Sequence, residues 1–274
     1  MAMNECDLGQ LDGPVLIFGG PYSNLQATRA LLERAVSQGV AGERIICTGD
    51  VVAYCADAAG TVAAIREAGC TVVAGNCEIQ LAAGEMDCGC GFAPGSTCDL
   101  LSAGWFAHAS ASLDADARDW MAGLPDLVIF THHGRRCAVI HGGVADVARF
   151  LWPTSPEADF AEEIARIEAV HGPIDMVLAG HCGLPFMRRI GHVDWVNAGV
   201  IGMPANDASP ETRFAVLEGG VPRIERLSYD HQAAAEAMRR AGLTQGYHLA
   251  LGSGYWPSED VLPPDLRREA TASG

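Results

Sequence analysis

Four predicted strands in this sequence each end at a glycine beside a polar residue, and this repeated pattern is the strongest constraint on the fold. The apolar stretches span residues 45–47, 72–74, 139–140 and 177–179, and they run into Asp50, Asn76, His141 and His181. Ligands in open α/β sheets bind beyond the carboxyl ends of the strands, where glycine lets the backbone turn sharply. The pattern therefore predicts an α/β (α+β) fold in which these four residues share one site, in preference to four unrelated turns.

The side chains of these four donor residues offer one carboxylate, one amide and two imidazoles. Nitrogen and oxygen ligands of this kind suit a divalent transition metal such as manganese, zinc or iron. A single buried histidine is more often a core residue than a ligand, but four polar strand ends favour a common site. We therefore expect a metal site at this edge of the sheet.

The length and the connections of the chain fit one domain. A chain of 274 residues allows one large domain or two small ones, and no long linker, repeat or low-complexity tract divides it. We expect one domain over residues 1–274, with a core over about 14–230 and a C-terminal helix and tail over 231–274. Within the core, Ser23 and Gln26 form a capping box that predicts a helix start at residue 24. The short strands between residues 186 and 227 are expected to run antiparallel.

Charge and composition limit the chemistry and the partners. All 18 basic residues are arginines, so no lysine is present to act as nucleophile or phosphate-loop residue. The net charge of −16 repels phosphate backbones, which argues against a nucleic-acid partner. No apolar run approaches the ~20 residues that span a membrane, and residues 1–10 lack the features of a signal peptide. We therefore expect a cytoplasmic protein without a membrane partner, whose ten cysteines are mostly reduced.

The order of these motifs resembles the calcineurin-like metallophosphoesterase superfamily, and most of all its small bacterial branch of diadenosine tetraphosphatase-like and phosphodiesterase-like proteins. That family reads Asp-x-His-Gly-Asn, then Gly-Asp, Gly-Asn-His-Asp or Glu, a single His before Gly, and Gly-His-x-His. The corresponding segments here are Gly20–Asn24, Gly49–Asp50, Gly75–Glu78, His141–Gly142 and Gly180–Gly183. The resemblance covers residues 15 to 229 and implies a four-layer αββα sandwich of two mixed β-sheets flanked by helices.

The departures from the family pattern concern one of its two metals. Family members hold a first metal with the Asp and His of the first motif, the bridging Asp and the last His of Gly-His-x-His. Here Gly20, Tyr22 and Gly183 replace three of those four ligands. The set for the second metal, which is the four donor residues, is intact. The resemblance therefore implies a degenerate centre with one divalent ion (manganese, zinc or iron) per chain.

The resemblance implies a divergent metallophosphoesterase-like hydrolase of reduced activity, acting on a small phosphate ester or anhydride through this incomplete site. A non-catalytic metal-, nucleotide- or redox-sensing binding protein on the same fold is the alternative. Cys77 replaces the family's general-acid histidine and is a poor proton donor at neutral pH. Thiol-dependent catalysis at Cys77 is a third alternative. The expected partner is a small phosphorylated molecule, and the oligomeric state stays open.

Several other residues near the motifs have two interpretations each. Tyr22, Asn24 and Asn197 are candidates for binding substrate, as their family counterparts suggest, with loop hydrogen bonding an equal alternative for the two asparagines. Trp152 and Trp256 are expected to be packing anchors rather than binding platforms, although an aromatic ring near the site could stack on a base or sugar. Five cysteines are either sulfur ligands that replace the lost ones or small space-filling residues: Cys77, Cys88, Cys90, Cys98 and Cys182.

Overall fold

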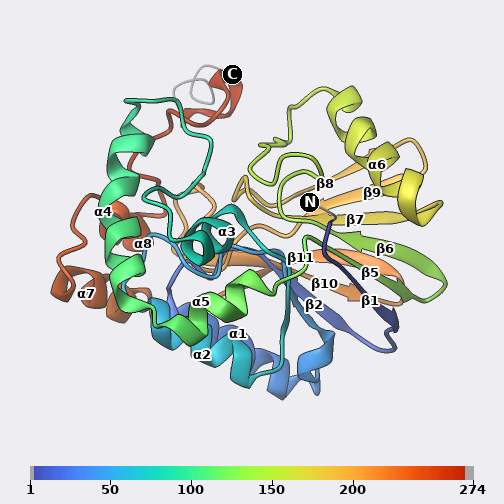
Figure 1. Ribbon diagram of the computed structural model, residues 1–274, viewed down its shortest axis with the longest axis horizontal. Coiled ribbons are helices and arrows are strands. Elements are labelled where there is room, and N and C mark those ends of the chain that lie inside the picture. The colour runs from blue at the N-terminus through green and yellow to red at the C-terminus, as the bar shows by residue number, and fades with distance from the viewer. Residues whose placement is uncertain (1–2, 269–274) are drawn as a thin grey trace.

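Two β-sheets packed face to face, with helices on both outer faces, make up the structure (Figure 1). It is a computed structural model that describes residues 3–268. The six-stranded sheet contains β1 (Glu5–Gln10), β5 (Leu127–His132), β6 (Arg135–Val139), β7 (Met176–Ala179), β8 (Phe186–Ile190) and β9 (Val193–Asn197). The five-stranded sheet contains β2 (Val15–Phe18), β3 (Ile45–Cys47), β4 (Thr71–Val72), β10 (Thr212–Glu218) and β11 (Val221–Leu227).

Both sheets are mixed, and the helices cover them unequally. The strand orders are β1-β5-β6-β7-β9-β8 and β11-β10-β2-β3-β4. The helices are α1 (Leu25–Ser37), α2 (Ala58–Glu67), α3 (Asn76–Ala83), α4 (Thr97–Ser112), α5 (Ala115–Ala122), α6 (Glu157–His171), α7 (His231–Arg240) and α8 (Tyr247–Ser253). Of these, α6 packs on the six-stranded sheet, and the others pack on the five-stranded sheet. This four-layer αββα arrangement confirms the fold class predicted from the sequence.

The alternation of side chains along each strand explains the layers. In β2, Val15 and Ile17 point into the apolar layer between the two sheets, while Leu16 and Phe18 pack against the helices. The strand β7 alternates in the same way between the inner layer and α6. Strands buried on both faces carry continuous apolar runs, so these segments can be recognised in the sequence.

The helix after β2 begins one residue later than predicted. Asn24, not Ser23, is the N-cap of α1, and its side chain accepts a hydrogen bond from Ala27 N at 3.1 Å. Ser23 instead adopts a left-handed backbone with φ of 56°. The predicted capping box, with Ser23 as N-cap, was therefore wrong, although the predicted start of the helix was correct to within one residue.

Other differences concern elements without a clear local pattern. The sequence analysis did not predict β1, α3, α4 or α8. The strands from 186 to 227 pair antiparallel as predicted, but as two separate hairpins: β8 with β9 in one sheet and β10 with β11 in the other. They do not form one continuous run, and β9 also pairs in parallel with β7. The predicted tail contains α8, and its last residues, 269–274, lie outside the described part. Over residues 3–268, none of the helices combines the length and the apolar character that crossing a membrane requires.

Candidate metal centre

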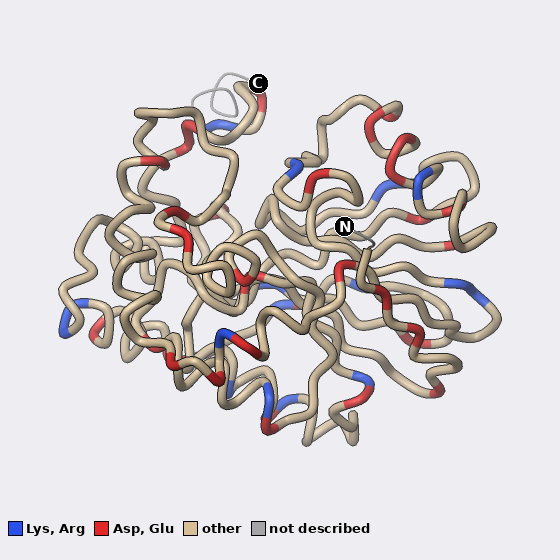
Figure 2. The backbone as a smooth tube through the Cα atoms, in the orientation of Figure 1, with Lys and Arg blue, Asp and Glu red and all other residues tan. Residues whose placement is uncertain are grey.

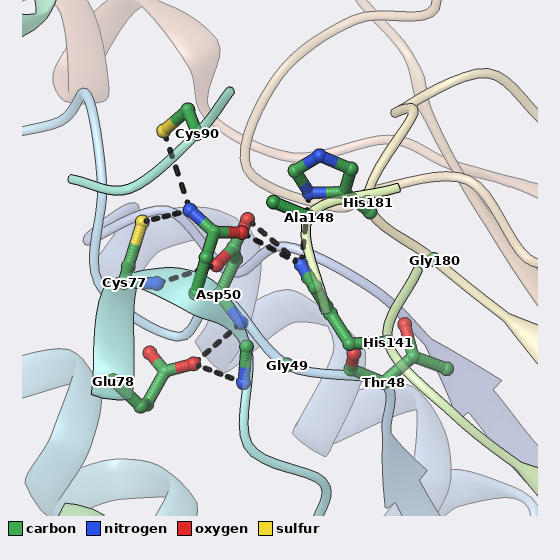
Figure 3. A network of polar contacts seen from close by, with 12 residues as sticks. Thr48, Gly49, Asp50, Cys77, Glu78, Cys90, His141, Ala148, Gly180 and His181 are labelled. Atoms are coloured by element: carbon green, nitrogen blue, oxygen red, sulfur yellow. Dashed lines mark hydrogen bonds and ion pairs between the residues drawn. The ribbon is translucent and has the colours of Figure 1, made fainter. Parts of the chain in front are cut away.

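The carboxyl ends of four strands, two from each sheet, meet and bring the four donor residues together (Figure 3). Asp50 and Asn76 follow β3 and β4 of the five-stranded sheet, and His141 and His181 follow β6 and β7 of the six-stranded sheet. All four side chains are buried. The residues that the sequence analysis grouped therefore do converge, at the boundary between the two sheets.

The donor atoms lie close enough to share one ion. His141 Nε2 is 3.0 Å from His181 Nδ1 and 3.1 Å from Asn76 Oδ1. The same nitrogen is 3.4 Å from Asp50 Oδ2. Metal–nitrogen bonds of about 2.0–2.1 Å give a tetrahedral site edges of about 3.3 Å. The donor spacing thus fits a small divalent cation with four protein ligands.

The orientation of His141 also suits a metal ligand. Its Nδ1 lies 2.6 Å from the backbone carbonyl oxygen of Thr48. Because a carbonyl oxygen only accepts hydrogen bonds, Nδ1 carries the proton, and Nε2 of the neutral ring presents a lone pair to the other donors. A contact of this kind at the second ring nitrogen fixes the tautomer of metal-binding histidines.

The backbone at the strand ends is adapted to this convergence. Asp50 and His181 have positive φ values of 57° and 59°. Such a conformation costs a non-glycine residue about 1–2 kcal/mol, and strain of this kind concentrates at functional sites. A Cβ atom on Gly49 would lie 2.7 Å from His141 Nδ1 and 2.8 Å from Gly75 N. A larger residue at position 49 would therefore displace His141.

Glu78 fixes the loop that carries Asp50. Its carboxylate accepts hydrogen bonds from Asp50 N at 2.7 Å and Gly75 N at 3.0 Å (Figure 3). It also accepts one from Val52 N at 3.3 Å. Burial, followed by the nearby charge of Asp50, raises the pKa of Glu78 to about 7. Glu78 is thus a positioning residue that links the end of β3 to the start of α3. In the sequence, Glu78 is recognisable only as the last residue of the Gly75–Glu78 motif, and its contacts with the backbone are not predicted.

The electrostatics of the site favour positive charge among the donors. Burial alone would raise the pKa of Asp50, but the neighbouring His141 and His181 outweigh it and hold that pKa below its ordinary value. Burial alone would lower the pKa of His141, but Asp50 outweighs it and raises that pKa. Burial, followed by the charge of His141, lowers the pKa of His181 to about 3, so its ring is neutral. A cation bound among the donors would take the place of the proton on His141.

Aromatic rings border the position of the family's first metal. Gly20 has a φ of 38°, and a Cβ there would lie 2.6 Å from Tyr22 Cζ and 2.7 Å from Val200 Cγ1. A Cβ on Gly183 would lie 3.4 Å from the ring of Trp256. Tyr22 lines the pocket next to Asp50, as the first motif predicted. The residues on this side do not fit a second metal ion.

Tyr22 does not replace the lost ligands. Its side chain is buried, and its ring packs edge-on against Tyr54 with 4.7 Å between the ring centroids. Burial, followed by the charge of Asp50, raises the pKa of the Tyr22 phenol well above its ordinary value. Tyrosine ligates metals as a phenolate, so the neutral Tyr22 offers bulk and a hydrogen-bond donor instead.

The two asparagines proposed as substrate contacts are engaged in the fold. Besides capping α1, Asn24 donates a hydrogen bond to Gly202 O at 3.0 Å. Asn197 donates to Gly180 O at 2.6 Å, immediately before His181. Neither asparagine lines the pocket beside the donor residues. The structure therefore places Asn24 in the helix cap and Asn197 behind the loop of His181.

No cysteine of the described residues joins the cluster of potential metal ligands, which consists of Asp50, His141 and His181 with Asn76 beside them. The backbone N–H of Cys77 donates to Asp50 at 3.3 Å. Burial, followed by the charge of Asp50, raises the pKa of the Cys77 thiol well above its ordinary value. Cys77 lies beside the donors, as predicted, but as a neutral thiol that packs rather than ligates.

Two cysteines of the adjacent loop form a disulfide, Cys88–Cys90, which differs from the reduced state expected of most cysteines, while the other eight are free. Asn76 Nδ2 donates to Cys88 O at 2.8 Å and lies 3.3 Å from Cys90 Sγ. These contacts turn the amide so that its oxygen faces His141. The loop thus positions one of the donors.

A pocket opens directly beside Asp50 and His181. Trp152 and Trp256 line it, so they are not the pure packing anchors that the sequence analysis expected. The pocket was missed because its residues come from segments far apart in the chain, which no local spacing connects. Its aromatic lining residues are Tyr22, Tyr54, Phe92, Phe150, Trp152, Tyr247 and Trp256.

Comparisons with known proteins identify the family and agree with the fold. The model of the calcineurin-like phosphoesterase superfamily domain matches residues 22–219. A metallophosphoesterase from Sphaerobacter thermophilus superposes with a TM-score of 0.68 at 18% identity, over 89% of this chain and 100% of its own. A hypothetical protein from Pyrococcus horikoshii OT3 superposes with a TM-score of 0.70 at 16% identity, over 88% and 98%. No curated protein sequence gives a significant match. Because the family model matches well over half of the chain, the protein belongs to the calcineurin-like phosphoesterase superfamily.

Proposed function

We propose that this protein is a phosphoesterase that works with one divalent metal ion, manganese, zinc or iron, held by the four donor residues. The observation that supports this function is the convergence of three lone-pair donors on His141 Nε2 at 3.0–3.4 Å. The substrate is a small phosphate ester or anhydride. Because Gly20, Tyr22 and Gly183 do not fit a second ion, we expect lower activity than in a two-metal enzyme.

The chain itself contributes positioning more than proton transfer. When bound, a divalent ion supplies Lewis acidity toward a phosphoryl oxygen. Thr48 fixes the ring of His141, and Glu78 fixes the backbone of Asp50. The neutral Cys77 thiol is a poor general acid, and the loss of a general acid costs about 10²–10⁴-fold in rate. Slow hydrolysis is therefore expected.

The test combines metal content with turnover of the full chain. Protein loaded with Mn²⁺ and dialysed should retain one ion per chain and slowly hydrolyse bis(4-nitrophenyl) phosphate. His181→Ala removes one imidazole donor and should lower both quantities by at least about tenfold, since even changes behind the ligands cost 10–100-fold in metal affinity. His192→Ala is the matched control, because His192 is exposed and lies outside the site, and it should change neither quantity.

Three outcomes would contradict parts of this proposal. Two tightly held ions per chain would contradict the single-metal centre. Equal hydrolysis by the wild type and His181→Ala would contradict the assignment of the donor residues. Hydrolysis that survives His181→Ala but disappears in Cys77→Ala would support a thiol-dependent reaction instead.

A redox-sensing binding protein on the same fold is the second candidate, and one observation favours it. The Cys88–Cys90 disulfide lies against the amide of Asn76, and Cys90 lines the pocket. Reduction by a dithiol such as dithiothreitol would give two thiols and alter the surroundings of a metal donor. A metal affinity that changes on reduction, without hydrolysis of any ester, would favour this candidate. A Cys88→Ser/Cys90→Ser variant, which cannot form the disulfide, is the control.

A further inference from the structure

The pocket beside the donor residues has walls of packed aromatic rings. Tyr54 lies 4.7 Å from Tyr22 and 4.6 Å from Tyr247 between ring centroids. Phe150 stacks on Trp152 at 5.0 Å, with an angle of 3° between the ring planes. The other lining residues, apart from Asp50 and His181, are small or apolar: Cys90, Cys98, Cys182, Gly183, Val200, Met203, Ser258 and Val261. The space next to the metal donors therefore suits an apolar, ring-shaped group.

Positive side chains are missing from the same pocket. None of the described residues that line it is an arginine, and the protein has no lysine. Arg149, the sequence neighbour of Phe150, pairs with three carboxylates, those of Asp159, Glu162 and Glu163. Arg267 and Arg268 follow the pocket-lining Val261 in the chain, but Arg267 donates to Leu262 O and Asp260 O, and Arg268 pairs with Glu259. Most other arginines lie on helices and strands away from the pocket (Figure 2). Extra phosphate charges in the pocket would have no side-chain cation beside them.

The charge at the donor residues limits the ligand further. A divalent ion and its four ligands would together carry one net positive charge, because Asp50 is the one anionic ligand and the imidazoles and the amide are neutral. The carboxyl group of Glu78 behind Asp50 can only make this charge less positive. A phosphodiester monoanion cancels that charge, whereas a monoester dianion leaves a net negative charge, and a polyphosphate leaves more. An uncompensated charge in an apolar environment is strongly unfavourable.

Neutral hydroxyl groups supply polar contacts in this apolar space. Tyr22, Tyr54 and Tyr247 line the pocket, and burial raises the pKa of each phenol above its ordinary value. A neutral phenol can donate a hydrogen bond to a phosphoryl oxygen without bringing a charge into the pocket. The lining thus matches a ligand that is largely apolar and has a single negative charge.

We propose that the site takes phosphodiester monoanions with at least one aromatic or similarly apolar ester group, and that it discriminates against phosphomonoesters and nucleoside polyphosphates. This inference rests on the proposed function and deepens it by naming the substrate class. The phosphoryl group lies beside Asp50 and His181, and the apolar ester group lies among Tyr54, Phe150 and Trp256.

Binding of three matched probes to the Mn²⁺-loaded full chain tests the inference by calorimetry. Methyl phenyl phosphate and dimethyl phosphate have the same charge and differ by the ring, while phenyl phosphate keeps the ring and is a dianion. Methyl phenyl phosphate should bind about 10- to 100-fold more tightly than dimethyl phosphate, because its ring leaves water, and with a negative change in heat capacity. It should also bind at least about tenfold more tightly than phenyl phosphate, which leaves a charge uncompensated.

A pair of variants tests the charge argument separately. Val261→Arg adds a cation to the pocket lining and should shift the preference toward phenyl phosphate by about tenfold. Val221→Arg makes the same change at a valine that is 59% exposed on β11 and does not line the pocket. This control should leave the preference unchanged.

The outcomes separate this inference from the proposed function. Preferential binding of methyl phenyl phosphate without hydrolysis of any diester would support the inference and overturn the phosphoesterase proposal. Equal binding of methyl phenyl and dimethyl phosphate, or tighter binding of phenyl phosphate, would overturn the inference, even if bis(4-nitrophenyl) phosphate is hydrolysed.

Discussion

The two halves of the site lie side by side at the carboxyl ends of the strands but carry opposite chemistry. In the donor half, Asp50, Asn76, His141 and His181 present lone pairs to one another, and Thr48 and Glu78 hold them in place. In the aromatic half, Gly20 and Gly183 have no donor atoms, and the rings of Tyr22 and Trp256 lie against them. The scaffold is the same for both halves, because the apolar layer between the sheets determines where the strands end.

This difference shows that the fold does not depend on a full set of metal ligands. Polar donors that converge in a buried site repel one another unless a proton or a cation lies among them, so the donor half needs a bound charge. Aromatic rings need no such partner and gain stability from burial, at about 25 cal/mol per Å². The aromatic half is therefore stable without a ligand, whereas the donor half depends on a positive charge, either the proton on His141 or a bound cation.

The largest expected effect comes from returning a carboxylate to the aromatic half. Gly20→Asp should lower the free energy of unfolding by about 2–5 kcal/mol, from overpacking against Tyr22 and Val200 and from the left-handed backbone. Denaturant unfolding measures this loss. Gly39→Asp is the control, because Gly39 has a φ of 67° with nothing within 4 Å of its Cβ position, and it should show the backbone contribution alone.

Full restoration of the family motif should fail for the same reason. The quadruple variant combines Gly20→Asp with Tyr22→His, Cys77→His and Gly183→His. It lacks the ring of Tyr22, but Val200 still overlaps the Cβ position of residue 20. We expect this quadruple variant to bind no second ion. A second ion per chain would show that the two halves differ only in side chains and share a backbone ready for both metals.

The next effect tests the donor half directly. Asp50→Ala removes its only carboxylate and should weaken Mn²⁺ binding by at least about 10²-fold, more than the loss of a group behind the ligands. Titration of the full chain with Mn²⁺ measures the change. Asp119→Ala, at an exposed position on α5, is the control. Unchanged affinity in Asp50→Ala would mean that the ion binds elsewhere.

A smaller loss of stability is expected from changing Glu78, which lies behind the donor residues. Glu78→Gln keeps the shape of the side chain but turns an amide NH₂ or a weaker acceptor toward three backbone N–H groups. The free energy of unfolding should fall by about 1–3 kcal/mol. Urea denaturation measures it, and the exposed Glu85→Gln is the control. Equal stability of both variants would show that Glu78 does not hold the Asp50 loop.

The smallest effect sharpens the contrast between the halves. Tyr22→Phe removes only a hydroxyl group, so metal content should stay the same and the free energy of unfolding should change by no more than about 0.5 kcal/mol. Metal analysis and thermal unfolding check both. Loss of the ion in this variant would make Tyr22 a phenolate ligand and erase the distinction between the halves.

The sequence reveals the donor half far better than the aromatic half. Strands such as β3 and β7 are short apolar runs that stop at glycine, so the positions of Asp50 and His181 follow from local pattern. The aromatic half depends on contacts between distant segments, as in Tyr54 with Tyr247, and no local spacing predicts them.

There are also physical reasons why the sequence did not predict α4 and α8 and why it misplaced the N-cap of α1. The buried face of α4 includes Ser102 and Ala109, while the apolar Leu100 is exposed, so the sequence shows no clear apolar stripe. The helix α8 has only seven residues, between Gly246 and Gly254. The N-cap of α1 was assigned to Ser23 because Ser23 and Asn24 are both good caps, and only the left-handed backbone of Ser23 decides between them.

The far wall of the pocket has a consequence for the order in which the protein is made. Tyr247 and Trp256 lie beyond residue 219, where the matched family domain ends, while all four donor residues lie within it. At about 5–20 residues per second, the ribosome needs several seconds to extend the chain from His181 to Trp256. During that interval the four donor residues have already been synthesised, while two aromatic rings of the pocket wall have not. The aromatic half of the site is therefore the last part to be completed.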